Sequence, residues 1–157
     1  MSELDSQYNK ILHARTVAIT DSVIPFDWVA GTRTYLERIV QQINGSYDYG
    51  FFDCCATLCR RLLESLIIEV FISQGRQDEI QNQGIFLALE ALINRICSDH
   101  AITLSRNSRR HMLDIKELGD TASHDRVYIT LKQDIDDTKF RYRRIINELL
   151  VAAAIKA

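Results

Sequence analysis

Residues that make tight turns are scarce along this chain, and their scarcity limits the folds open to it. The 157 residues include one proline and six glycines, whereas a protein built from many strands needs a turn about every 8–12 residues. Apolar residues recur instead with the period of about 3.6 residues that is typical of amphipathic helices. We therefore predict an all-α fold, an antiparallel helical bundle with short connections.

Apolar stripes and turn signals predict where the helices lie. A capping-box pattern at Ser2 and Asp5 begins an accessory N-terminal helical region, residues 1–26, which Pro25 closes. The rest of the single domain, residues 27–157, forms the bundle. Its helices are expected over residues 27–45, ending at Asn44-Gly45, then 53–72, 85–96 and 105–118, with a last helix that begins at Thr130. The segment over residues 53–72 is apolar in most directions, so we expect it at the centre.

Composition excludes several classes of protein. The formal net charge of -2 gives no general attraction to nucleic acid or to anionic lipid. The longest apolar run, residues 66–72, is too short to cross a bilayer, and residues 1–8 lack the pattern of a secretory signal. We expect a cytoplasmic protein with no membrane partner.

Four cysteines, at positions 54, 55, 59 and 97, raise the question of disulfides or a metal. Without a secretion signal, reduced core residues are the expected state. Zinc sites usually draw on paired, closely spaced ligands in loops, and this chain has no such pairs. We predict no metal and no cofactor.

The segment Leu118 to His124 concentrates polar chemistry between two long amphipathic segments. It contains Gly119, the carboxylate of Asp120 and the imidazole of His124. If the segment is helical, Asp120 and His124 share a face, and the pair is a usable acid or base. In the alternative interpretation Gly119 ends one helix, Asp120 caps the next, and His124 is a partly buried donor that ties the turn to the bundle.

Arg60 and Glu64 are polar exceptions on the apolar central helix. Four residues apart, they can form an ion pair on one face, and each then needs partners from neighbouring helices. One partner is the segment that begins at Gly119. We interpret Arg60, Glu64 and Gly119 as a buried polar latch that fixes how the helices pack. A ligand-binding role is the alternative.

Two short motifs and the long closing helix resemble a known family. The motifs are Cys55-Ala56-x-x-x-Arg60-x-x-Leu63-Glu64 and Leu118-Gly119-Asp120-x-Ala122-x-His124. Over residues 53–154 the chain is similar to the bacterial domain of unknown function 4145 family, which is grouped with the HEPN superfamily. The resemblance implies a helical bundle that often dimerises and that occurs in prokaryotic defence, restriction and toxin–antitoxin systems.

The resemblance also suggests which residues would act in catalysis. Active HEPN ribonucleases carry an arginine, an adjacent polar residue and a histidine four to six residues beyond the arginine. Asp120 and His124 match the last two, but Gly119 stands where the arginine belongs. Cleavage of RNA without a metal needs a cation for the charge that develops on the phosphate, and glycine supplies none. Lys116 or Arg126 would have to stand in.

Two basic clusters complete the candidate residues. The first is Arg106, Arg109 and Arg110 with His111; the second is Lys139, Arg141, Arg143 and Arg144. In the second cluster Asp137–Arg141 and Arg144–Glu148 are spaced as salt bridges on a solvated face. If the clusters line one groove, they contact nucleic-acid phosphates. The candidate phosphate contacts are Arg106, Arg109, Arg110, Lys116 and Arg126.

The sequence thus favours a non-catalytic interaction or regulatory module in a prokaryotic defence, restriction or toxin–antitoxin system. We expect it to act as a homodimer or on a partner protein, with nucleic acid as a less favoured ligand. The alternative is a metal-independent ribonuclease or nucleotide-binding protein that uses His124 and Asp120.

Overall fold

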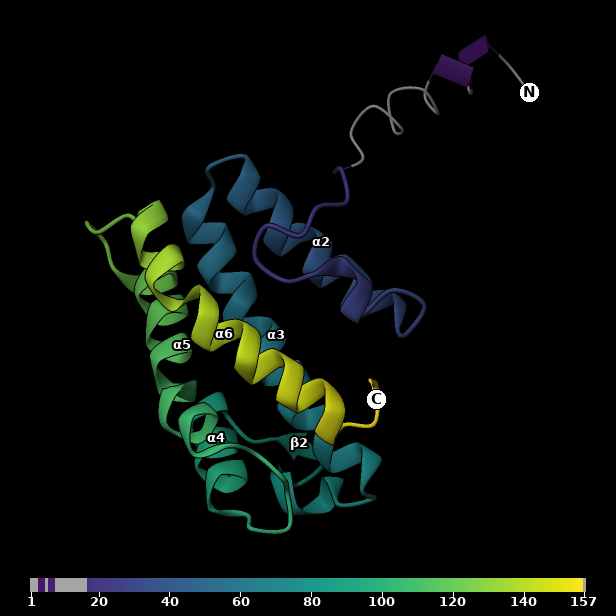
Figure 1. Cartoon of the computed structure of the whole chain (residues 1–157), viewed down its shortest axis with the longest axis vertical. Helices are drawn as coiled ribbons and strands as arrows, with labels where there is room; N and C mark the ends of the chain where they lie inside the picture. Colours follow the sequence, from purple (N-terminus) through teal and green to yellow (C-terminus); the bar gives the residue numbers. More distant parts are fainter. Residues whose placement is uncertain (1–2, 5, 8–16, 157) are drawn as a thin grey trace.

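The chain folds into a bundle of α-helices, as its periodicity predicts (Figure 1). The computed structural model describes residues 3–4, 6–7 and 17–156. Within these ranges the helices are α2 (Thr34–Asp48), α3 (Phe52–Ser73), α4 (Leu89–Ser98), α5 (Arg106–His124) and α6 (Lys132–Ala152). The remaining elements are two short 3-10 helices, η1 (Phe26–Trp28) and η2 (Gln77–Ile80), and a hairpin of β1 (Gln81–Asn82) with β2 (Ile85–Phe86). The predicted all-α class is confirmed.

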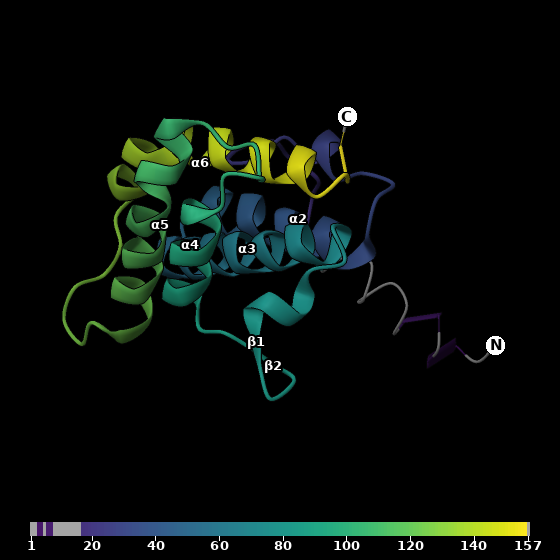
Figure 2. The same ribbon diagram turned by 90° about the horizontal axis from the view of Figure 1, so that it is seen from below.

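Helix α3 is the centre of the bundle. It packs against α2, α4, α5 and α6, and the helices surround it in both views (Figures 1 and 2). The buried side chains of α3 point in several directions because neighbours cover most of its faces, while one stripe with Cys54, Thr57 and Arg61 is exposed. They are Cys55, Ala56, Cys59, Leu62, Leu63, Leu66, Ile67, Val70 and Phe71. The Tyr142 hydroxyl of α6, fully buried, donates to the Cys59 carbonyl of α3 at 3.0 Å.

Long-range contacts fix the direction of each helix. Thr57 bonds Ser123 at 3.1 Å and Arg60 bonds Asp120 at 2.7 Å, so α5 runs antiparallel to α3. The Ser105 N–H donates to Glu148 at 2.9 Å, near the opposite ends of α5 and α6, so α6 is antiparallel to α5. The predicted antiparallel arrangement is therefore present, with α4 as a short helix between α3 and α5.

The N-terminal region differs from its prediction. Residues 17–25 form no helix, and most of the predicted first helix, including Ser2 and Asp5, lies outside the described residues. The segment before Pro25 is instead held against α2 by the buried side chain of Asn44. The Asn44 Oδ1 accepts from the N–H groups of Val23 and Ile24, both at 2.9 Å, and its Nδ2 donates to the carbonyls of Thr20 and Ile24.

Both predicted ends of the helix over residues 27–45 are wrong. Asn44 and Gly45 do not end a helix, because α2 continues to Asp48 and uses Asn44 as a buried anchor. The left-handed residue that follows the helix is Gly50, with φ of +79°. At the other end, residue 27 falls in η1, and α2 begins only at Thr34.

Helices α3 and α6 begin at Phe52 and Lys132, within two residues of their predicted starts. The N-cap of α3 is Phe51, and Asp53 lies in the first turn, where its carboxylate accepts the Thr130 N–H at 2.8 Å. Helix α6 begins one residue after Leu131, whose N–H bonds the Asp134 carboxylate at 2.8 Å. Asp53 thus joins the start of α3 to the connection before α6.

The cysteines are free in this structure. Cys55 and Cys59 are buried core residues as expected, and burial raises the pKa of the Cys59 thiol. Cys54 is exposed, contrary to its expected place in the core. No helix in the described ranges has the length and apolar character needed to span a membrane.

Candidate functional site

The segment around Gly119 is a helix and not a turn. Helix α5 continues through Leu118 to His124, so the interpretation of Gly119 as a helix end and Asp120 as a cap is wrong. Gly119 is needed because α5 lies close to α3 here. A methyl group at Gly119 would lie 2.5 Å from the Arg60 Cβ and 3.1 Å from the Ala56 carbonyl oxygen.

The contact between these helices positions a cluster of three charged side chains, which we name the Asp120 bridge: Arg60, Lys116 and Asp120. The Arg60 Nε donates to Asp120 Oδ1 at 2.7 Å, and the Lys116 Nζ donates to Oδ2 at 2.5 Å. Burial raises the pKa of Asp120, but the hydrogen bonds from Lys116 and Arg60 outweigh it and hold the pKa below its usual range. The carboxylate is therefore ionised and fully engaged in helix packing.

Glu64 contributes less to the predicted latch than Asp120. It lies 3.6 Å from Arg60, and its side chain is 38% exposed. The side chains of Arg60 and Asp120 are each 30% exposed, so the latch is partly exposed and not buried as predicted. Solvent screens an ion pair in such a place, and the pair contributes little to stability.

Replacing Asp120 with asparagine should lower the free energy of unfolding by about 1 kcal/mol at pH 7, since the negative charge and one of the two accepting oxygens are lost under partial solvent screening. The folded pKa is lowered, so this stabilisation is present above the unfolded value of about 3.9 and disappears as pH falls through the folded pKa. Urea denaturation of both proteins at a series of pH values tests this. Glu64→Gln is the control and should change stability little. A difference at Asp120 that persists unchanged at the lowest pH would contradict the assignment.

His124 lies at the end of α5, exposed, and its ring makes no recorded hydrogen bond within the described residues. The interpretation of His124 as a partly buried donor is therefore wrong. The nearby cations, Arg60 and Lys116, bind Asp120 and are not recorded against the imidazole. Arg126, the other candidate substitute for the missing arginine, is exposed in the connection that follows α5.

The groove between α5 and α6 on this side is acidic. A cavity of about 340 Å³ there is lined partly by the carboxylate side chains of Asp114, Glu117, Asp134 and Asp137. These carboxylates would repel the phosphates of an RNA strand. The structure thus places Asp120 and His124 on one helix, but within the described residues no cation is bonded to the imidazole, and the cavity between α5 and α6 is acidic.

The five candidate phosphate contacts do not form one surface. Arg109 donates to five backbone carbonyls around the end of α4, at 2.6–3.3 Å, so its role is structural. Lys116 belongs to the Asp120 bridge. Arg106, Arg110 and Arg126 are exposed.

The second basic cluster is also divided among several roles. Arg143 donates to the Val23 carbonyl at 2.6 Å, and Lys139 lies 4.6 Å from the Tyr47 ring centroid. The predicted pairs Asp137–Arg141 and Arg144–Glu148 are absent: Asp137 accepts from Gln133 and Glu148 from the Ser105 N–H. This leaves Arg141 and Arg144 facing the groove between α5 and α6.

One feature of the surface was missed by the sequence interpretation. Two connections, α2 to α3 and α5 to α6, lie at the upper end of the bundle in Figure 1. Both contain large apolar side chains that are exposed. These side chains, which we name the apolar end, are Tyr49, Phe51, Val127, Tyr128, Ile129 and Leu131, with exposed fractions between 44% and 77%. The apolar run Val127-Tyr128-Ile129 immediately after a helix-ending polar segment was the signal that could have revealed it.

Known proteins add no further identification. No protein-family model, no curated protein and no solved structure matches the chain. Among the described residues, no three His, Cys, Asp or Glu side chains gather as ligands for a metal ion.

Proposed function

We propose that this protein is a non-catalytic interaction module that forms a homodimer through the apolar end. The observation that carries the proposal is the exposure of six large apolar side chains on two neighbouring connections. Single exposed apolar residues are ordinary on a soluble protein, but a contiguous group usually marks a contact surface. The hydrogen bond from the Thr130 N–H to Asp53 holds the two connections together as one surface.

The amount of apolar surface suits a dimer. At the exposed fractions above, six such side chains offer on the order of 600 Å², and a stable interface buries about 800 Å² from each partner. Tyr49 and Phe51 stack with 6.5 Å between their ring centroids. Aromatic side chains of this kind are typical anchors at the centre of protein interfaces.

The charges that flank the apolar end support a second copy as the partner. Asp125 and Arg126 lie next to each other immediately before Val127. A two-fold interface brings the same surface together with itself, so an adjacent acid and base on one copy can face the base and acid of the other. A partner with a large net charge would instead need a surface whose charges all have the opposite sign.

Light scattering coupled to gel filtration tests the dimer. The wild-type chain should elute at twice the monomer mass, and Ile129→Asp should shift it to the monomer by placing a charge in a desolvated contact. Ile85→Asp is the matched control, because Ile85 is similarly exposed, at 73% against 69%, but lies on β2, away from this end. A monomeric wild-type protein, or a dimer that survives Ile129→Asp, would refute the proposal.

The prokaryotic defence setting remains part of this proposal and rests on the resemblance alone. The proposal that the protein is not catalytic rests on three features together: glycine at position 119, the engagement of Arg60 and Lys116 by Asp120, and the acidic cavity between α5 and α6. Cleavage of structured RNA by the pure protein, lost in His124→Ala, would favour the ribonuclease alternative instead.

A further inference from the structure

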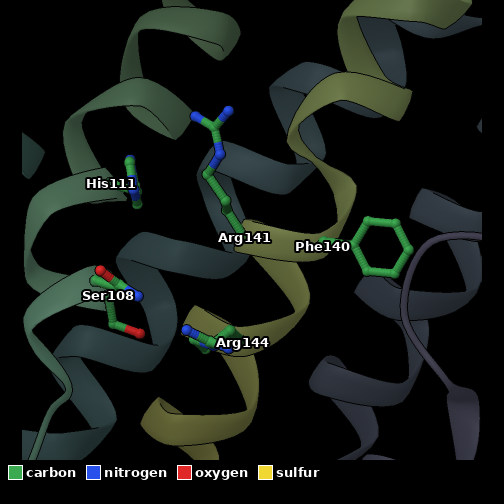
Figure 3. A pocket seen from close by; sticks show the side chains of 6 residues that line it. Ser108, His111, Phe140, Arg141 and Arg144 are labelled. Atoms are coloured by element: carbon green, nitrogen blue, oxygen red, sulfur yellow. The ribbon is translucent and has the colours of Figure 1, made fainter.

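A cavity of about 310 Å³ lies between the start of α5 and the middle of α6 (Figure 3). Small-molecule sites in proteins have volumes of roughly 300–1,000 Å³, so the cavity suits a small ligand. In Figure 3 Ser108 and His111 come from α5, whereas Arg141 and Arg144 come from the facing side of α6. Asn107 and Phe140 complete the lining. The cavity therefore collects cationic and hydrogen-bonding side chains from two helices.

Both arginines keep donors for a ligand. Arg144 has no recorded hydrogen bond or ion pair with the described part of the chain, because Glu148, four residues on, accepts the Ser105 N–H instead. Arg141 has only a long contact, 3.6 Å, with Asp114, and half of its side chain is exposed. A guanidinium that is not satisfied within the protein is the group best suited to bind a phosphate with two parallel hydrogen bonds.

The α5 side of the cavity offers further donors. Ser108 is buried, and its hydroxyl oxygen accepts from the Ser105 hydroxyl at 3.2 Å, which leaves its own proton free to donate. The His111 Nδ1 lies 3.0 Å from the Asp114 carboxylate, which orients the ring, and Nε2 donates to a phosphate only when the ring is protonated. The same residues belong to the first turns of α5, whose N–H groups add a positive potential.

We propose that this cavity binds the phosphate group of a small phosphorylated ligand. Two guanidinium groups on α6 and a hydroxyl on α5 line facing walls of the cavity, and such donors recognise a phosphate. Asp114 contacts both His111 and Arg141 at the edge of the cavity, and further along the same groove the walls become acidic, with Glu117, Asp134 and Asp137. A nucleic-acid strand that followed the groove would meet these carboxylates, whereas a single phosphate would not. The charge change along the groove thus selects a compact anion over a polymer.

The test uses inorganic phosphate and the full chain, with ionic strength held constant by sodium chloride. Amide shifts in two-dimensional NMR spectra should saturate and concentrate at residues 107–111 and 140–144. Arg144→Gln should weaken phosphate binding about tenfold or more, since a charged hydrogen bond contributes about 1.5–3 kcal/mol. Arg110→Gln removes the same charge from an exposed position of α5 that does not line the cavity, and it should change binding less than about twofold.

Three results would overturn the proposal. The first is a set of amide shifts that never saturate with added phosphate. The second is a loss of phosphate binding in Arg110→Gln as large as in Arg144→Gln, which would indicate non-specific attraction of phosphate to surface charge. The third is a single-stranded RNA oligomer that binds far more tightly than phosphate with a steep salt dependence. The cavity is about four helical turns from His124 along α5, and Ile129 lies beyond His124 in the following connection. The Ile129→Asp protein should therefore bind phosphate normally whether or not the dimer exists.

Discussion

Replacing Asn44 with alanine is expected to lower the free energy of unfolding by about 3–4 kcal/mol, because each buried polar group that loses its partner costs about 1–3 kcal/mol. The side chain of Asn44 bonds two N–H groups and two carbonyls of residues 20–24, and it is fully buried. Alanine offers none of these bonds and leaves a cavity. For a chain of this length the melting temperature should fall by roughly 10 °C.

Gln41→Ala is the matched control for Asn44. Gln41 lies on the same helix, and its Nε2 donates only one hydrogen bond to the same segment, to the Val17 carbonyl at 2.6 Å. Its loss should cost about 1 kcal/mol. Chemical denaturation of the three proteins measures both values. Equal losses for Asn44→Ala and Gln41→Ala would show that the N-terminal segment is not anchored at Asn44.

The sequence was sufficient to predict the class of fold, because a helical period sustained over long segments leaves few alternatives. Its central helix was also predictable, since residues 54–72 are apolar on almost every face. The ends of the helices were not. Asn44-Gly45 looks like a stop, yet the amide of Asn44 bonds residues that are about 20 positions earlier. Local propensity cannot reveal a partner that only tertiary packing brings near.

The same limit explains the candidate site. The spacing of Asp120 and His124 correctly places them one helical turn apart, but only the structure shows that Asp120 is engaged by Arg60, 60 residues away. Pairs four apart in sequence, such as Arg144 and Glu148, were reasonable expectations. Glu148 instead accepts a backbone N–H at the start of α5. A free N–H at a helix start competes for a carboxylate, and that competition leaves Arg144 open to a ligand.

Replacing Gly119 with alanine is expected to lower the free energy of unfolding by about 2–3 kcal/mol, even though alanine is the better helix former by about 1 kcal/mol. The added methyl group would lie 2.5 Å from the Cβ of Arg60 and 3.1 Å from the Ala56 carbonyl oxygen. Neither atom can move without the α3 backbone. The two helices must therefore separate, which also lengthens the hydrogen bond between Arg60 and Asp120.

Gly45→Ala is the control that isolates this effect. Gly45 lies within α2, so the gain in helix propensity is the same, but a methyl group there meets only the side chain of Val17. That side chain belongs to a loop segment and can rotate away, so stability should stay within about 1 kcal/mol of the wild type. Thermal and urea denaturation measure the stability of both alanine variants. Equal stability of the two would contradict the explanation that position 119 needs glycine because α5 lies close to α3. A large loss confined to Gly119→Ala would instead show that this contact determines both the packing of the central helix and the geometry of the Asp120 bridge.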